Sequence, residues 1–304
     1  MQLKSDQVAL ITGGASGIGL GIARALGGQG LAIAIADIDP EALNSAQRTL
    51  EAEGVTCLPV HLDVTSASSW KQAADRVWAR FGRLDIVCNN AGVGQGQREK
   101  GVAPGLINMS ESTWRLVMET NATSVFLGVR EIVPRMLADG RPGHVVNTAS
   151  MAGLIAPAGL GAYAASKFAV VALSESLRAE LASMGIGVSI LCPGGVESRL
   201  SANSESRHAL AAGRPAKVVN PAGVILMPAE DVGQRVLEAI VEDRLHVITH
   251  PEYLPLVEER QRAVLAAFQD VPDTAFLDPE PLLRSSRNPS YAEAAARDGI
   301  ENKS

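Results

Sequence analysis

Three side chains in the middle of the chain have the types and the spacing of a proton-transfer site. Tyr163 and Lys167 lie four residues apart, and Ser150 lies thirteen residues before Tyr163. A free phenol has a pKa of about 10, so it can serve as a base at neutral pH only where a neighbour stabilises its phenolate. An ammonium one helical turn away could do that, and a hydroxyl could hold the oxygen of a substrate. We therefore expect these groups to move a proton to or from an alcohol or a carbonyl.

The alternative for Tyr163 and Lys167 is a solvated pair on a helix surface, since an aromatic residue followed by lysine at this spacing is commonly that. Ser150 favours the functional interpretation, because it directly follows a short apolar run at 144–149. A hydroxyl at the end of a strand faces the edge of a sheet where ligands bind.

A glycine-rich turn near the N-terminus predicts a dinucleotide site. It occupies residues 12–19, between an apolar run at 8–11 and a helical pattern. Glycines let backbone N–H groups approach a pyrophosphate, and the helix that follows adds the positive end of its dipole. The residues expected to contact the cofactor here are Gly13, Ser16, Gly17, Ile18 and Gly19. The alternative is a plain turn in which Ser16 caps the helix.

Asp37 predicts the choice of cofactor. It closes the apolar run at 32–36, where a carboxylate can accept both hydroxyls of the adenosine ribose and would repel a 2′-phosphate. No basic residue occupies the glycine-rich turn, and Ile38 stands where a phosphate-binding arginine could have stood. We therefore expect NAD, with NADP less favoured. The alternative role of Asp37 is that of a helix N-terminal carboxylate ahead of Pro40 and Glu41.

Short apolar runs alternate with helical patterns along most of the chain, which is typical of a parallel sheet with helices on both faces. The runs lie at 8–11, 32–36, 56–62, 85–88, 144–149, 188–192 and 246–249. The polar candidates that follow these runs are Gly13, Asp37, Asp63, Asn89, Asn90, Ser150 and Pro193, all at the edge where open sheets bind ligands. We predict an α/β fold of the Rossmann type: a doubly wound, parallel, seven-stranded sheet in one dinucleotide-binding and catalytic domain at 1–250.

Two regions depart from this alternation. Residues 199–228 are rich in small and polar residues without a sustained period, and we expect a substrate lid there, the alternative being a disordered surface insertion. Residues 251–304 form a C-terminal extension with a helix expected at 254–268. We expect this extension to pack on the same domain or on a neighbouring subunit.

Composition and charge exclude several classes of function. The 304 residues carry a net charge of −6, and no basic stripe could follow a phosphate backbone, so we expect no nucleic-acid partner. No apolar stretch is long enough to cross a bilayer. Neither the three cysteines (Cys57, Cys88 and Cys192) nor the five histidines have metal-ligand spacing, so we expect no metal. A cytoplasmic protein with a small-molecule partner fits these features.

Asn121 is the least obvious candidate. It lies at helical spacing from Trp114, Val117 and Val125, on what should be the buried stripe of a helix. A buried carboxamide needs hydrogen-bond partners. The alternative is a local helix distortion that the backbone alone satisfies.

Taken together, these residues resemble those of the short-chain dehydrogenase/reductase family, in its compact single-domain branch. The resemblance covers residues 5–250 and rests on the Thr-Gly-x-x-x-Gly-x-Gly turn at 12–19, Asn-Asn-Ala-Gly at 89–92, Asn121, Ser150, Tyr-x-x-x-Lys at 163–167 and Pro-Gly at 193–194. It implies a catalytic tetrad of Asn121, Ser150, Tyr163 and Lys167, with a water linking the Asn121 region to Lys167 in a path for protons. It also implies that Lys167 and Tyr163 contact the nicotinamide ribose.

The resemblance extends the expected cofactor site beyond the glycine-rich turn. Asp63 and Val64 would lie along the adenine, and the cleft would be lined by Asn90, Ala91 and Gly92. After Pro193 and Gly194, Val196 would contact the carboxamide, and Ser198 occupies a position where the family more often has threonine.

The chain is also similar, in size, in the region 188–193 and in the tail around 247–252, to bacterial dehydrogenases that oxidise the benzylic secondary alcohol of lignin-derived aryl ethers. This similarity implies a bulky, partly aromatic alcohol or ketone as substrate. The family further implies a homodimer or homotetramer that pairs helices near 111–138 and 163–184.

We therefore expect an NAD-dependent oxidoreductase that interconverts a secondary alcohol and a ketone by hydride transfer, with Tyr163 as general acid or base. Three alternatives stay open: an NADP-dependent ketoreductase, an epimerase or dehydratase on the same fold, and a non-catalytic dinucleotide-binding protein. The four tetrad side chains argue against the last, because binding alone needs no poised phenol.

Overall fold

Seven parallel strands form one sheet in the computed structural model, which describes residues 1–96, 105–198, 200–211, 226–269 and 280–297. The strands are β1 (Val8–Thr12), β2 (Ala32–Asp37), β3 (Cys57–His61), β4 (Ile86–Asn89), β5 (Gly143–Thr148), β6 (Ile186–Cys192) and β7 (His246–Ile248). Their order is β3-β2-β1-β4-β5-β6-β7, and every neighbouring pair is parallel. The order reverses between β1 and β4, which places a ligand crevice beyond their carboxyl ends. The predicted seven-stranded Rossmann-type fold is confirmed.

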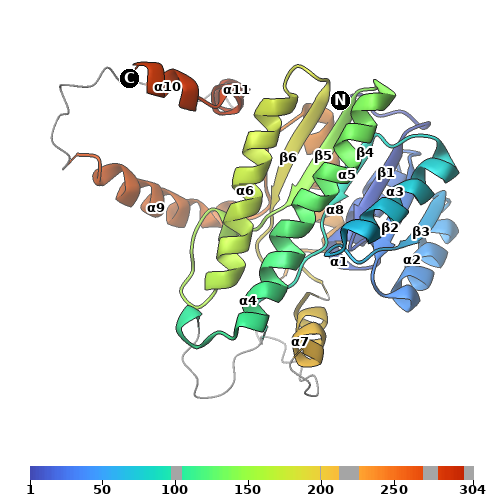
Figure 1. Ribbon diagram of the computed structural model, residues 1–304. Helices are drawn as coiled ribbons and strands as arrows, with labels where there is room; N and C mark the ends of the chain where they lie inside the picture. Colours follow the sequence, from blue (N-terminus) through green and yellow to red (C-terminus); the bar gives the residue numbers. More distant parts are fainter. Residues whose placement is uncertain (97–104, 199, 212–225, 270–279, 298–304) are drawn as a thin grey trace.

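Helices cover both faces of the sheet (Figure 1). One face carries α1 (Gly17–Gly27), α2 (Pro40–Ala52) and α8 (Ala229–Glu242). The other carries α3 (Ala67–Phe81), α4 (Glu111–Met118), the π-helical segment η2 (Glu119–Thr123), α5 (Ser124–Asp139) and α6 (Gly161–Leu181). Because both faces are covered, the strands read as nearly continuous apolar runs rather than as alternating ones.

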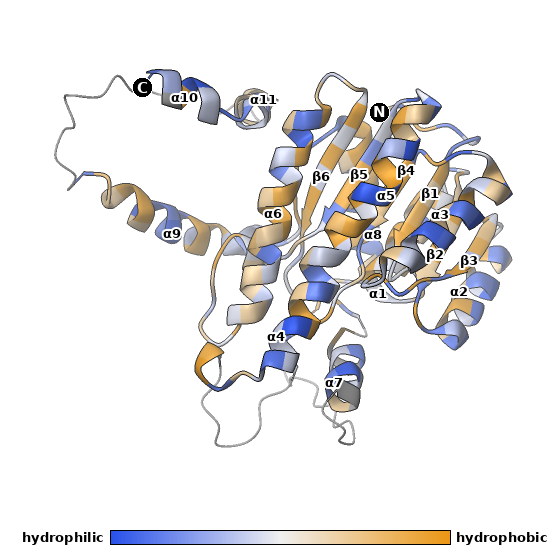
Figure 2. Ribbon diagram, in the orientation of Figure 1, coloured by the Kyte–Doolittle hydropathy of each residue, from blue (hydrophilic) through white to orange (hydrophobic). Residues whose placement is uncertain are grey.

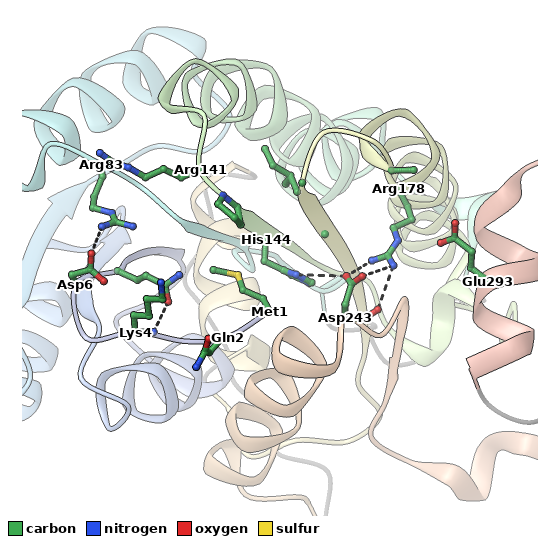
Figure 3. Close-up of a pocket in the computed structure, with 17 residues that line it drawn as sticks. Met1, Gln2, Lys4, Asp6, Arg83, Arg141, His144, Arg178, Asp243 and Glu293 are labelled. Atoms are coloured by element: carbon green, nitrogen blue, oxygen red, sulfur yellow. Dashed lines mark hydrogen bonds and ion pairs between the residues drawn. The ribbon is translucent and has the colours of Figure 1, made fainter.

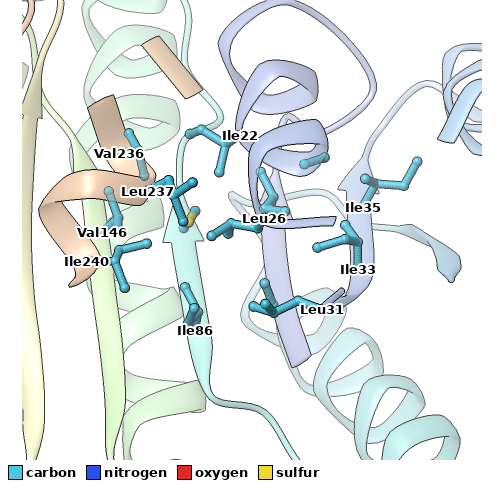
Figure 4. Close-up of a cluster of buried hydrophobic side chains, with 14 of the residues drawn as sticks. Ile22, Leu26, Leu31, Ile33, Ile35, Ile86, Val146, Val236, Leu237 and Ile240 are labelled. Carbon is cyan, nitrogen blue, oxygen red and sulfur yellow. The ribbon is translucent and has the colours of Figure 1, made fainter. Parts of the chain in front are cut away.

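The core between the sheet and α1 with α8 fixes the helix that follows the glycine-rich turn. Ile22 and Leu26 of α1 meet Val236 and Ile240 of α8 above the strands (Figure 4). Each such aliphatic side chain, fully buried, contributes about 1.5–3 kcal/mol. Gly21 lets the two helices approach closely, since a Cβ there would lie 2.2 Å from the carbonyl oxygen of residue 229. The start of α1 is therefore held firmly against β1 and β2.

The region predicted as a lid is partly described. Residues 200–211 form a helix, α7 (Leu200–Ala211), where the sequence showed no sustained period. Tertiary contacts account for the helix, since Ser204 and His208 bond to the chain that follows β4. Residues 199 and 212–225 lie outside the described residues. The lid itself stays a prediction.

The C-terminal extension begins with the 3₁₀ turn η4 (Pro251–Tyr253) and continues as α9 (Leu254–Ala266), α10 (Glu280–Ser286) and α11 (Pro289–Arg297). The helix expected at 254–268 is confirmed to within two residues at its end. Tyr291 of α11 donates a hydrogen bond of 2.8 Å to Glu175 of α6, so α11 packs on the main body. Residues 270–279 and 298–304 lie outside the described residues, and the division at residue 250 stays a prediction.

Apolar residues are concentrated on the strands, and α9 projects from the body yet also carries apolar residues (Figures 1 and 2). Leu254, Leu265 and Phe268 are all more than half exposed. None of the described helices combines the length and the apolar character that crossing a bilayer would take.

Candidate active site

The carboxyl edge of the sheet gathers the residues that the sequence singled out. Gly13 follows β1, Asp37 ends β2, and Asn90 follows β4. Ser150 and Pro193 follow β5 and β6. The strands adjoin one another in the order given above, so these positions lie along one edge around the point where the strand order reverses.

The glycine-rich turn has the shape of an anion cradle. Gly13 and Gly17 have φ values of +63° and +50°, which favour glycine, and a Cβ on Gly19 would lie 2.2 Å from the carbonyl oxygen of Gly13. Ser16 occupies the N-cap of α1, but its side chain makes no capping hydrogen bond. The N–H groups of the first turn are thus left for a ligand rather than for a serine cap, which argues against the plain-turn alternative.

A cavity of about 410 Å³ adjoins this turn. Ser16 and Gly17 line it on one side and Ser198 on another, so the predicted cofactor residue beyond β6 faces the turn across the same space. Val196 pairs with Met227 in an isolated parallel bridge, which ties the segment after β6 to the start of α8. Ile18 packs against the core beneath α1.

Asp37 does not cap a helix. Asp39 caps α2 instead, accepting from the backbone N–H groups of Glu41 and Ala42 at 3.0 and 3.1 Å. The Oδ1 atom of Asp37 accepts from the N–H of Ile38 at 2.8 Å. Burial raises the pKa of Asp37, and backbone hydrogen bonds oppose that shift. The helix-terminal alternative therefore fails, and the carboxylate stays at the sheet edge beside the turn.

Asn90 and Ala91 are tied to the first strand. The hydroxyl of Thr12 accepts from the N–H groups of both residues, at 2.9 and 3.0 Å, and the Asn90 amide donates to the carbonyl of Thr12 at 3.0 Å. Gly92 lies between two predicted catalytic side chains, because a Cβ there would lie 3.2 Å from Asn121 Oδ1 and 3.6 Å from Lys167 Nζ. This segment therefore connects the turn to the tetrad.

Asp63 and Val64 follow β3. The carboxylate of Asp63 accepts from the N–H and the hydroxyl of Thr65 at 3.0 and 2.7 Å, which makes a local turn. Val64 is buried, and its carbonyl accepts from Trp70 Nε1 at 3.0 Å. Nothing in these contacts assigns the two residues to an adenine, so that role stays a prediction.

Tyr163, Lys167 and Ser150 converge. Tyr163 lies in the first turn of α6, and Lys167 Nζ is 5.6 Å from the centroid of the phenol ring. The Ser150 hydroxyl lies close enough to the phenol to lower the pKa of Tyr163. Lys167 Nζ donates to the carbonyl of Thr148 at 2.9 Å, and Ser150 Oγ donates to the carbonyl of Pro193 at 3.3 Å. The three groups thus stand together between the ends of β5 and β6.

Burial shapes the ionisation of this group. It raises the pKa of Tyr163, with the Ser150 hydroxyl acting in the opposite direction. It lowers the pKa of Lys167 to about 8. In the protein alone, desolvation therefore favours the neutral phenol, and the stabilisation of the phenolate by Lys167 together with an oxidised nicotinamide stays a prediction.

The sequence left two interpretations of Asn121 open, a buried carboxamide with hydrogen-bond partners and a local helix distortion, and the structure shows both. Asn121 lies in the π-helical segment η2, so the helix is distorted, and Trp114, expected on the buried stripe, is 38% exposed. The carboxamide of Asn121 accepts from the N–H of Val93 at 2.8 Å and donates to the carbonyl of Val93 at 2.9 Å. It also donates to Ser166 Oγ at 3.1 Å. A water between Asn121 and Lys167 stays a prediction.

Sequence reasoning missed two side chains that hold this site together. His250, for which the sequence analysis excluded only a metal-ligand role, accepts from the N–H of Gly194 at 3.1 Å through Nδ1, and its Nε2 lies 3.1 Å from the carbonyl of Gly195. It clamps the turn after β6. Gln95 caps the start of α6 through Ala162 and Tyr163. Neither residue belongs to a spacing motif, and both act across more than fifty residues of chain.

A larger cavity, of about 820 Å³, lies at the opposite, amino end of the strands (Figure 3). Charged side chains line it, and two of its cations form ion pairs: Arg178 with Asp243, and Arg83 with Asp6 of the same lining and with Asp85 beneath it. None of the predicted site residues reaches it. Within the described part of the chain, no three or more His, Cys, Asp or Glu side chains gather as metal ligands.

Known proteins are similar to this chain in sequence. Residues 7–209 match the family model of the short chain dehydrogenases. The chain is 36% identical over 246 residues to the 1-deoxy-11-beta-hydroxypentalenate dehydrogenase of Streptomyces exfoliatus, covering 81% of this chain and 84% of that protein. It is 33% identical over 270 residues to a C alpha-dehydrogenase of Sphingobium sp., covering 86% of each.

Solved structures agree with the sequence relatives. A short chain dehydrogenase/reductase of Burkholderia phymatum in complex with NAD matches with a TM-score of 0.77 at 34% identity, covering 88% of this chain and 96% of that one. An actinorhodin polyketide ketoreductase with NADPH matches with a TM-score of 0.68 at 28% identity, covering 82% and 98%. Relatives of this fold thus bind either nicotinamide dinucleotide.

Proposed function

This chain belongs to the short-chain dehydrogenase family, and we propose that it is an NAD-dependent oxidoreductase that interconverts a secondary alcohol and a ketone. The observation that carries the proposal is the meeting of Ser150, Tyr163 and Lys167 at the carboxyl edge of the sheet. That edge also holds the open glycine-rich turn and Asp37.

The residues at this edge fit a dinucleotide. The first turn of α1 offers uncapped N–H groups to a pyrophosphate, and a Cβ on Gly19 would collide with the carbonyl oxygen of Gly13 and distort the turn. Asp37 supports NAD over NADP, because its carboxylate would face the ribose hydroxyls and repel a phosphate there. When bound, the nicotinamide ring supplies the carbon that accepts or gives the hydride.

Tyr163 is the group that exchanges a proton with the substrate oxygen. In the oxidation direction the phenolate takes the proton of the alcohol, and in the reduction direction the phenol gives it back. Ser150 holds the same oxygen and lowers the pKa of the phenol against the effect of burial. Positive charge next to the phenol, from Lys167 and from an oxidised nicotinamide, favours the anionic form. Oxidation should therefore accelerate as the pH rises through the apparent pKa of Tyr163.

We propose a bulky, partly aromatic substrate. Similarity to the C alpha-dehydrogenase of Sphingobium sp. supports this choice over a small alcohol. Apolar side chains from the turn after β5 and from the extension meet in one cluster, which includes Met151, Leu154 and Tyr253. The extension at 251–304 thus adds apolar surface close to Ser150.

The test is a spectrophotometric screen of wild-type protein with NAD and a panel of secondary alcohols, aliphatic and benzylic, followed by the same panel with NADP. We expect reduced cofactor to form fastest with NAD and a benzylic alcohol. Higher kcat/KM with NADP would overturn the role of Asp37. Absence of reduction with every alcohol, and of oxidation with the matching ketones, would overturn the activity and leave an epimerase, a dehydratase or a binding protein.

A further inference from the structure

The helix that carries Tyr163 and Lys167 has no cap of its own. Leu160 occupies the N-cap position of α6, and its side chain cannot accept a hydrogen bond from the first turn. A residue from elsewhere fills this role. Gln95 Oε1 accepts from the N–H groups of Ala162 and Tyr163 at 3.1 and 3.2 Å, and Gln95 Nε2 donates to the carbonyl of Gly159 at 3.1 Å.

Tyr163 is therefore held at its own backbone by Gln95. It is the third residue of α6, within the turn that frays most readily when its N–H groups lack acceptors. Lys167 lies one turn further in and is fixed by its bond to the carbonyl of Thr148. Loss of the Gln95 bonds would thus let the phenol move relative to Ser150 while the ammonium stays in place.

The segment that carries Gln95 joins three elements of the site. The carboxamide of Asn121 bonds to both the N–H and the carbonyl of Val93. The N–H of Gly94 donates to Ser204 Oγ at 2.7 Å, and the carbonyl of Gly94 lies 2.9 Å from His208 Nε2, both on α7. Consecutive residues thus contact η2, α7 and α6.

We propose that Gln95 is a positioning residue for Tyr163. Through Gln95, the docking of α7 on Gly94 also affects the orientation of the phenol. The proposal rests on the proposed function of Tyr163. Proton transfer requires the phenol oxygen within hydrogen-bond reach of the substrate oxygen, so a small rotation of the first turn of α6 reduces kcat. Binding of a dinucleotide at the glycine-rich turn does not depend on that rotation.

Two substitutions at Gln95 separate positioning from simple stabilisation. Gln95→Leu keeps the size and removes both polar groups, and kcat should fall about 30-fold, with little change in the dissociation constant of NAD. Gln95→Glu keeps an acceptor for the two N–H groups, so kcat should recover to within about threefold of wild type. The added negative charge near the phenol should shift the pH profile of kcat by about half a unit to higher pH.

Ser110→Ala is the matched control. Ser110 caps α4, which packs beside α6, and accepts from the N–H of Thr113 at 3.1 Å without touching Tyr163. This variant loses a capping bond of the same kind and should keep kcat and its pH profile. Amide hydrogen exchange of residues 161–164, measured without substrate, should accelerate in Gln95→Leu and stay unchanged in Ser110→Ala.

Three outcomes would overturn the proposal: a kcat of Gln95→Leu equal to that of wild type, equal losses in Gln95→Leu and Ser110→Ala, or a kcat of Gln95→Glu as low as that of Gln95→Leu. Failure of the proposed function is distinct, since wild-type protein would then reduce no NAD at all while the exchange difference persists. The link to α7 is tested by a double-mutant cycle of Gln95→Leu with His208→Leu. We expect non-additive losses in kcat, and strict additivity would refute the link.

Discussion

The two edges of the sheet bury charged side chains in different ways. At the amino edge, Arg178 is buried and paired with Asp243, whose Oδ2 lies 2.8 Å from Arg178 Nη2. At the carboxyl edge, Lys167 is equally buried, yet its ammonium donates to the carbonyl of Thr148, and no carboxylate of the described residues lies within ion-pair distance. A paired buried cation holds the fold together, whereas an unpaired one costs stability and is typical of a functional site.

Among the tests of this comparison, the largest expected effect comes from removing the unpaired cation. Lys167→Met should lower kcat/KM about 10³-fold, because the phenol loses the neighbouring charge and the nicotinamide ribose loses a donor. The folded pKa of Lys167, about 8, lies below the unfolded value, so the ammonium destabilises the fold at pH 7. The thermal midpoint should therefore stay equal or rise. Retained turnover, or a large drop in the midpoint, would remove the distinction between the two edges.

Removing the paired cation should lower stability and leave activity unchanged. Arg178→Met leaves Asp243 without its guanidinium and should lower the free energy of unfolding by about 2 kcal/mol, a figure reduced for screening because the Asp243 side chain is 32% exposed. The kcat of the folded enzyme should be unchanged. Urea unfolding and assays below the transition check both parts, and a selective loss of kcat would place catalytic machinery at the amino edge.

How far the sequence predicts the molecule depends on whether a feature lies in one stretch of chain or joins distant stretches. The strand runs, the glycine-rich turn and the spacing of Ser150, Tyr163 and Lys167 are local patterns, so fold and proton-transfer group follow from them. The capping of α6 by Gln95 and the clamping of the turn after β6 by His250 cannot be predicted in this way, because each joins segments that only the folded sheet brings together. The paired groups of the amino edge likewise carry no motif.

The ionisation of Tyr163 and Lys167 could not be predicted from the sequence either. Tyr163 and Lys167 at one helical turn predict a phenolate beside an ammonium, but the depth of burial decides their pKa values, and depth depends on how the whole edge packs. The π-helical segment at Asn121 could not be predicted from the local sequence either, because Asn121 bonds to Val93, which is remote in sequence.

The amino edge also contains a buried histidine, His144, which makes the stability of the fold depend on pH. Burial lowers the pKa of His144 to about 3, and although Asp243 opposes this shift, Arg178 and the N-terminal amine add to it. The unfolded chain therefore binds a proton that the folded chain does not, and stability is lost as the pH falls below about 6.5. The loss by pH 5 should be about 2 kcal/mol. His144→Gln should show a smaller difference between urea midpoints at pH 7 and pH 5, and an equal difference would contradict this account.

The smallest expected effect concerns the acidic side chain of the carboxyl edge. Asp37→Asn keeps the size and removes the charge, so the ratio of kcat/KM for NAD to that for NADP should fall about tenfold. The unfolding midpoint should change little, since Asp39 provides the cap of α2. A ratio that does not move would show that the carboxylate does not face the ribose.

The most direct test of the central claim is the kcat of Tyr163→Phe for the best secondary alcohol, measured with NAD together with the dissociation constant of NAD. Because the phenol is the group that takes the proton, kcat should fall at least about 10³-fold while NAD binding stays within about threefold of wild type. A variant that keeps most of the wild-type turnover would contradict the assignment of Tyr163 and the proposed proton transfer.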